Sequence, residues 1–195
     1  MVYNFLFFIR SIRLLPHFVL FHFSKQNTLI SYDITRWMEV LKINGNLKIG
    51  FFKLMLFYPE FRNLFYYRVG HGASKYVYFL CPKMNTLFIN CSTIGRGLFI
   101  QHGFATIIEA NSIGDNCWIN QQVTIGFSNS KDCPTILDNV TITAGAKVIG
   151  NVIIGNNSVV GANSVVVKNV PDNCVVVGVP AVIIKKNGIK VKESL

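Results

Sequence analysis

The chain has 195 residues, of which 51% are hydrophobic, 13% aromatic and 14% charged, so it has ample apolar material for a core and is not a disordered chain. Residues 1–90 carry 11 basic and 3 acidic side chains, a net charge of +8, whereas residues 91–195 carry 8 and 6, a net charge of +2. A basic first half suits an anionic partner, such as a membrane face, nucleic acid or a phosphorylated substrate.

The first nine residues are apolar, but Arg10 and Arg13 interrupt the run long before the roughly 18–20 apolar residues that a membrane crossing needs. A signal peptide is also disfavoured, because the charges follow the apolar stretch and no small-residue cleavage site is clear. Two interpretations of residues 1–25 stay open. They dock on the rest of the protein, or they lie on a membrane surface.

Residues 1–85 are predicted to form an α-helical segment. Ser31 and Asp33 precede a run in which apolar residues recur at helical spacing, which predicts a helix over 34–41. Further helices are expected over 49–58 and 59–68, the last ended by glycines.

From residue 94 onward, Ile or Val recurs every six residues, with one extra residue after the second position and a longer gap after the sixth. The twelve positions are Ile94, Ile100, Ile107, Ile113, Ile119, Ile125, Ile136, Ile142, Val148, Ile154, Val160 and Val166. A second small or aliphatic position lies four residues on, at Leu98, Cys117, Val123, Val140, Ala146, Ser158 and Ser164. Each unit makes one short strand and one tight turn, three units close a triangular coil, and the aliphatic residue points inward. Twelve units make about four stacked coils, enough for a continuous core.

This repeat resembles that of the hexapeptide-repeat acyltransferases, and segments 94–103, 119–126, 144–151 and 178–181 resemble the serine acetyltransferase group. Segment 59–68 is similar to that of short relatives assigned to polysaccharide O-acetylation. The resemblance implies a mainly β fold, with a left-handed parallel β-helix over 86–186 behind the helical segment and a basic tail over 187–195. It also implies a homotrimer, with acetyl-CoA in the cleft between adjacent coils.

His102 is the candidate catalytic residue. Acetyl transfer to a hydroxyl needs a base that takes the hydroxyl proton and then protonates the departing thiolate, which one imidazole can do. His102 is the only histidine after residue 71, and it lies where the six-residue period slips. In serine acetyltransferases a carboxylate fifteen positions earlier steadies this histidine, but Leu87 stands there in this chain, and Gln101 replaces the adjacent acid. Glu109 or a backbone carbonyl is left to orient the ring.

The acceptor loop, residues 128–134, also departs from the family. Serine acetyltransferases carry an arginine and a histidine there, and this chain has Asp132 and Cys133. The loop therefore lacks the cationic pair that would bind an amino acid's carboxylate, although Lys131 is adjacent. Cys133 is a candidate substrate contact. We therefore expect a sugar hydroxyl as the acceptor, with serine as the alternative.

For the donor, the resemblance places Ala144 and Ala162 at turns where the pantetheine arm runs close to the backbone. Lys168 and Lys185 match basic positions that meet the phosphates of CoA, and Pro180 shapes the final turn.

The resulting functional hypothesis is an acetyl-CoA-dependent O-acetyltransferase acting on a capsular or cell-surface polysaccharide or its precursor. A different class of function, a non-catalytic trimeric scaffold or membrane-surface adaptor, is compatible with the basic first half. No metal is expected, because a zinc site of the carbonic-anhydrase type needs three histidines. Nucleic-acid binding is disfavoured, because the charge is not interleaved with aromatics along a groove. Five cysteines without a Cys-x-x-Cys pair favour the cytoplasm, with an inner-membrane-face location left open.

Overall fold

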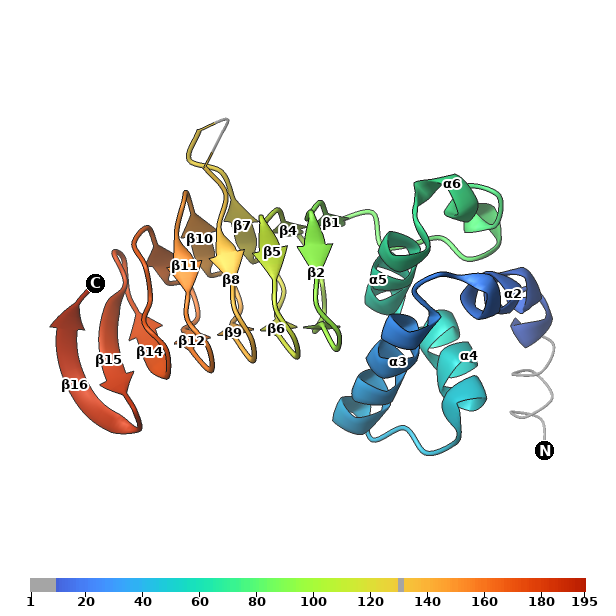
Figure 1. Cartoon of the computed structure of the whole chain (residues 1–195), viewed down its shortest axis with the longest axis horizontal. Helices are drawn as coiled ribbons and strands as arrows, with labels where there is room; N and C mark the ends of the chain where they lie inside the picture. Colours follow the sequence, from blue (N-terminus) through green and yellow to red (C-terminus); the bar gives the residue numbers. More distant parts are fainter. Residues whose placement is uncertain (1–9, 130–131) are drawn as a thin grey trace. The chain divides into compact units, whose positions relative to one another are not determined.

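The structure is a computed structural model that describes residues 10–129 and 132–195. The chain divides into two compact units between Met84 and Asn85. The first unit is helical and the second is a stack of short strands, as Figure 1 shows. This confirms the expected fold class, a parallel β-helix preceded by an α-helical segment. Within the described residues, no helix has the length and apolar character that a membrane crossing requires.

The helical unit has short helices joined by tight turns. They are α2 (Leu15–Phe23), α3 (Asn27–Leu41), α4 (Leu47–Phe57), α5 (Pro59–Val69), α6 (His71–Ser74) and the 3-10 turn η1 (Tyr78–Leu80). The side chain of Asn46 accepts a hydrogen bond from the Ile49 amide and caps α4, while Pro59 opens α5. The predicted start of α3 was wrong, because the helix already begins at Asn27. Asp33, expected before the helix, lies inside it and forms a tertiary ion pair.

Aromatic rings fill the core of the helical unit. Phe51 stacks on Phe21 with ring centroids 5.4 Å apart and meets Phe65 edge-on at 5.6 Å. Trp37 meets Phe61 edge-on at 5.3 Å. All five side chains are at most 7% exposed. The aromatic residues of α3, α4 and α5 therefore pack the core.

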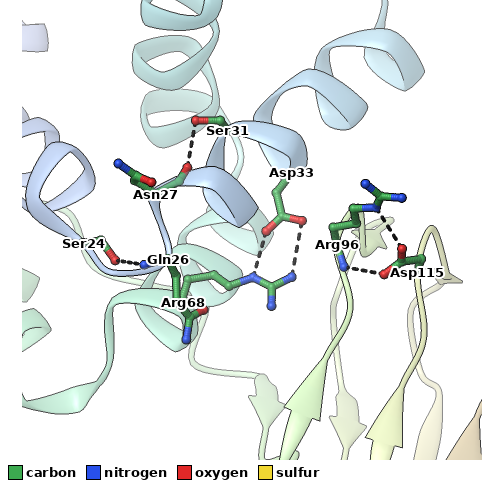
Figure 2. A network of polar contacts seen from close by, with 8 residues as sticks. All are labelled: Ser24, Gln26, Asn27, Ser31, Asp33, Arg68, Arg96 and Asp115. Carbon is green, nitrogen blue, oxygen red and sulfur yellow. Dashed lines mark hydrogen bonds and ion pairs between the residues drawn. The ribbon is translucent and has the colours of Figure 1, made fainter.

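One ion pair is buried inside this unit. Arg68 Nε donates to Asp33 Oδ2 at 2.9 Å, and its Nη2 lies 3.4 Å from the other carboxylate oxygen (Figure 2). Both side chains are 2% exposed. The pair joins α3 to α5, and each charge relies on the other because water does not reach them.

His17 makes the stability of this unit depend on pH. The side chain is fully buried, with Nε2 at 2.8 Å from Tyr66 Oη, and burial lowers the pKa of His17 from 6.5 to about 4. Between these values the unfolded chain binds a proton that the folded chain does not, so stability is lost as pH falls from 6.5 towards 4. We expect a free energy of unfolding about 2 kcal/mol lower at pH 5 than at pH 7, measured by urea denaturation.

A His17→Gln variant should lose most of this pH dependence, while His22→Gln, which changes an exposed histidine of the same helix, should keep it. An unchanged difference between pH 5 and pH 7 in His17→Gln would assign the effect to other groups.

The second unit is a solenoid of parallel strands. They are β1 (Leu87–Ile89), β2 (Thr93–Ile94), β3 (Phe99–Ile100), β4 (Thr106–Ile108), β5 (Ser112–Ile113), β6 (Trp118–Ile119), β7 (Thr124–Gly126), β8 (Thr135–Ile136), β9 (Thr141–Ile142), β10 (Lys147–Ile149), β11 (Ile153–Ile154), β12 (Val159–Val160), β13 (Val165–Val166) and β14 (Cys174–Val177). Strands three apart along the chain pair from β1 to β13, and β14 pairs with β12, which gives three sheets that wrap one core, with orders β1-β4-β7-β10-β13, β11-β8-β5-β2 and β14-β12-β9-β6-β3. The coil that contains β7 and β8 has more residues between its strands than the others, and the described residues 127–129 and 132–134 extend beyond the neighbouring coils (Figure 1).

The inward ladder follows the six-residue period with one correction. Eleven of the twelve predicted Ile and Val positions are buried, and so are all seven second positions. Ile107 is 42% exposed, whereas Ile108 is fully buried and pairs with Ile125. The prediction for Ile107 was wrong because the turn before it uses one more residue than the sequence pattern indicates. His102 and Ala105 both take positive φ in that turn.

Asparagines hold successive turns of one corner together. Asn139, Asn157 and Asn173 all have φ near +56°, a region that asparagine tolerates better than other side-chain-bearing residues. The Asn139 amide donates to Asn157 at 3.2 Å, and the Asn157 amide donates to Asn173 at 3.1 Å. These hydrogen bonds pair the asparagine side chains of neighbouring coils, which stack at the spacing of adjacent strands.

The segment over 187–195, expected as a basic tail, is instead mostly a strand. β15 (Val182–Lys186) and β16 (Ile189–Ser194) form an antiparallel hairpin that extends the sheet of β14. Asn187 and Gly188, at φ 49° and 84°, make the tight turn between them. The turn is an Asn-Gly dipeptide, which is a strong hairpin signal that the charge of the segment obscured.

Candidate functional site

His102 lies in the turn after β3, at a corner of the solenoid. Its side chain is exposed and its φ is +65°. A histidine in this region of backbone space is uncommon, and here the turn requires it. The imidazole is therefore held outside the stacked core, where a substrate can reach it.

The coil under this turn is held by an aromatic pair. Phe99 and Trp118, at paired positions of β3 and β6, meet edge-on with ring centroids 4.7 Å apart. Trp118 Nε1 donates to Gln101 Oε1 at 3.2 Å. Gln101 stands where the family acid was expected, and its side chain anchors the turn rather than contacting a carboxylate partner.

Successive coils bring the predicted donor residues into line with His102. β3 pairs with β6 in register, and the Gln122 amide donates to the Phe104 carbonyl at 2.8 Å, so the turn that carries His102 lies against the turn that carries Gln121. The Gly145 amide donates to the Gln121 carbonyl at 3.0 Å, and the Asn163 amide donates to the Ala144 carbonyl at 2.9 Å. His102, Gln121, Ala144 and Ala162 thus occupy equivalent turns of four successive coils. We call this set the corner column.

Two buried polar atoms beside the corner column were not anticipated. Among the described residues, Asn120 Oδ1 and Gln121 Oε1 are shielded from water and have no hydrogen-bond partner. Buried acceptors normally have partners, so these two oxygens are exceptions in the turn one coil below His102. The polar run that follows Ile119, one coil below His102, was the signal in the sequence.

The sheet β1-β4-β7-β10-β13, next to the corner column, carries a row of outward-facing side chains. Phe88, Ile107, Thr124, Lys147 and Val165 occupy matching outward positions of β1, β4, β7, β10 and β13. Phe88 is 60% exposed. Lys147 Nζ donates to the Gln122 carbonyl at 2.5 Å, which places a cation beside the corner column. Sequence reasoning missed Lys147, although its place directly before an inward Val marks it as outward-facing.

Lys168 and Pro180 line one hollow near the last coils. Its volume is about 100 Å³, and its lining also includes Val165, Val167, Ala181, Val182, Ser194 and Leu195. Lys168 Nζ donates to the Leu195 carbonyl at 2.8 Å. Lys185 is exposed on β15, outside the lining. The hollow offers an apolar floor and a cation, which suit one end of a phosphate-bearing cofactor.

Glu109 and Cys133 lie elsewhere in the solenoid. Glu109 follows β4, at the opposite end of that strand from His102, and its carboxylate accepts from Asn90 Nδ2 at 2.6 Å. Cys133 is 5% exposed, and its Sγ donates to the Glu109 carbonyl at 3.2 Å. Burial raises the pKa of the Cys133 thiol. The structure brings these two residues together, apart from the corner column.

Asp132 is the anionic residue of the acceptor loop. One carboxylate oxygen, Oδ2, accepts from Ser128 Oγ at 2.9 Å and from Asn129 Nδ2 at 2.6 Å. None of the loop residues that the structure describes carries a positive charge. Across residues 10–129 and 132–195, no group of three or more His, Cys, Asp or Glu is arranged to hold a metal ion.

Comparisons with known proteins agree with this geometry. The family model described as "Bacterial transferase hexapeptide (six repeats)" matches residues 133–168. A serine acetyltransferase of Synechococcus elongatus is 37% identical over 71% of this chain, and the match spans 62% of that relative's length. One of Bacillus pumilus is 36% identical over 75% of this chain and 73% of its own. A Brucella abortus serine acetyltransferase solved in complex with coenzyme A superposes with a TM-score of 0.68 at 27% identity, covering 90% of this chain and 74% of that structure.

Proposed function

Because this chain belongs to the serine acetyltransferase family, we propose that it is an acetyl-CoA-dependent O-acetyltransferase that uses His102 as its base. The observation that carries the proposal is the corner column. An exposed imidazole stands at one end of it, and small side chains at Ala144 and Ala162 follow on successive coils. The column leaves room for a long, narrow donor beside the backbone.

In the proposed reaction, His102 removes the proton of the acceptor hydroxyl as its oxygen attacks the thioester carbonyl. The carbon–sulfur bond then breaks, and the imidazolium returns the proton to the thiolate of CoA, so one side chain serves both half-steps. In this proposal Lys168 and Lys147 pair with negative charge on the donor.

We infer further that the chain assembles as a homotrimer with His102 at the seam between two copies. Phe88, Phe104 and Ile107 leave 60%, 55% and 42% of their surfaces exposed around the turn that carries His102. Apolar surface of this kind, next to a polar site, is typical of an interface. A second copy against it would also shield the acetyl-transfer site from water.

Two acceptors are supported by different observations. The relatives are named as serine acetyltransferases, which favours the hydroxyl of free serine over a sugar hydroxyl as the acetyl acceptor. Asp132 in the acceptor loop favours a sugar hydroxyl as the second candidate. Asp132 would repel the carboxylate of an amino acid, and a carboxylate readily accepts hydrogen bonds from sugar hydroxyls.

A single pair of measurements separates the two acceptors. CoA release is followed with a thiol reagent while L-serine or a panel of mono- and oligosaccharides is supplied, for the wild type and for Asp132→Asn. If serine is the acceptor, removing the negative charge should lower its KM. If a sugar is the substrate that receives the acetyl group, the same change should raise its KM several-fold. A charged carboxylate accepts a hydrogen bond from a sugar hydroxyl more strongly than a neutral amide does.

Glu193→Gln is the matched control, since it removes an exposed carboxylate of the hairpin and should leave both rates unchanged. Calorimetry with acetyl-CoA completes the test. A chain that binds no acetyl-CoA and releases no CoA with either acceptor class would be a non-catalytic scaffold, and the proposal would be wrong.

A further inference from the structure

Helix α2 presents an apolar face to solvent. Leu15, Val19 and Phe23 recur at helical spacing on the side opposite the buried His17 and Phe21, and they are 53%, 52% and 79% exposed. Ile12, which precedes the turn at residues 13–14 before α2, is also 53% exposed. We call these four exposed side chains the α2 face. In Figure 1, α2 lies at one edge of the helical unit.

Exposed cations lie on the same segment as this face. Arg10, Arg13 and Lys25 are exposed on the same segment. Lys48 Nζ lies 5.7 Å from the ring centroid of Phe18, a residue of α2. Residues 10–32 contain no Asp or Glu, and the first acid along the chain, Asp33, is buried against Arg68. No carboxylate of this segment therefore offsets its cations.

We propose that the α2 face is a binding surface for an anionic lipid membrane, on which the helix lies in the plane of the headgroups. Exposed aliphatic and aromatic side chains enter the boundary between headgroups and acyl chains, while arginine and lysine pair with lipid phosphates. Charge complementarity selects this occupant over a second copy of the chain, because two copies of the face would bring like charges together. The surface serves to hold the protein at a membrane, whatever its acceptor.

Vesicle sedimentation of the full-length protein tests the proposal without reference to activity. The protein is mixed with vesicles of pure phosphatidylcholine or with vesicles in which about a third of the lipid is phosphatidylglycerol. We expect binding to the second kind only, weakened by high salt because the charges are exposed. Arg13→Gln with Lys25→Gln should weaken it by about 25-fold, since each cation near an anionic surface contributes about five-fold.

A second double variant, Val19→Gln with Phe23→Gln, tests the apolar contribution. It keeps the charge and uses a good helix former, and it should weaken binding by at least about ten-fold. Both residues are mostly exposed, so the fold should persist, as circular dichroism can verify. Matched controls lie on the hairpin of β15 and β16. Lys190→Gln with Lys192→Gln removes the same charge, and Ile189→Gln removes a residue that is 68% exposed.

The controls should bind like the wild type. An equal loss in the lysine control would mean that net charge alone drives adsorption, which would overturn the proposal. Absence of binding to anionic vesicles would overturn it as well. A change of oligomeric state in Val19→Gln with Phe23→Gln, with vesicle binding retained, would instead assign the face to a second copy of the chain.

Discussion

Replacing His102 by asparagine is expected to lower kcat/KM for acetyl transfer by about 10²–10⁴-fold, which is the contribution typical of a general base. Asparagine is the informative substitution because it tolerates the φ of +65° that this turn requires, whereas alanine would add backbone strain. The loss should fall on kcat, measured as CoA release with a saturating acceptor. Acetyl-CoA binding by calorimetry should change little.

His22→Asn is the control for this experiment, because it removes an exposed histidine of the helical unit. It should keep the wild-type rate. If His102→Asn retained that rate with every acceptor, the corner column would not be the site of chemistry.

The largest stability effect is expected at the buried ion pair of the helical unit. Arg68→Leu leaves the Asp33 carboxylate buried without its guanidinium, and losing one partner of such a pair costs about 3–5 kcal/mol. Urea unfolding can be followed by tryptophan fluorescence in a Trp118→Phe background, so that Trp37 reports on the helical unit. Asp33→Leu with Arg68→Leu should recover most of the loss, because an apolar pair leaves no buried charge.

Arg96→Leu provides the contrast within the same chain. Arg96 Nε lies 2.8 Å from Asp115 Oδ2, so the contact is as short as the buried one (Figure 2), but the two side chains are 53% and 36% exposed. Water screens an exposed pair, and its loss should cost about 0–1 kcal/mol. If Arg68→Leu were no more costly than Arg96→Leu, the buried pair would not hold α3 and α5 together.

Part of the candidate site could be anticipated from the chain itself. The slip in the repeat and the chemistry of acetyl transfer both indicated His102, and the equivalent turns of successive coils could be aligned by counting. Lys147, Asn120 and Gln121 were missed because their significance depends on which coil lies beside which. Glu109 and Cys133 were considered because of their chemistry and family position, but the structure places them away from the imidazole.

The six-residue rhythm of aliphatic residues was sufficient to specify the solenoid, since a periodic core admits one stacking and repeats it. Apolar residues at helical spacing, and Pro59 at the start of α5, separately indicated the helical character of the first unit. Contacts between distant segments settled the remainder. Whether Ile107 or Ile108 points into the core depends on the number of residues in the turn before them. Helix α3 starts earlier than expected, and Asp33 inside it forms its ion pair with Arg68 on α5. In the hairpin of β15 and β16, β15 pairs with the edge of β14, and β16 pairs with β15. These are interactions across many residues, and the periodicity of a local sequence carries no record of them.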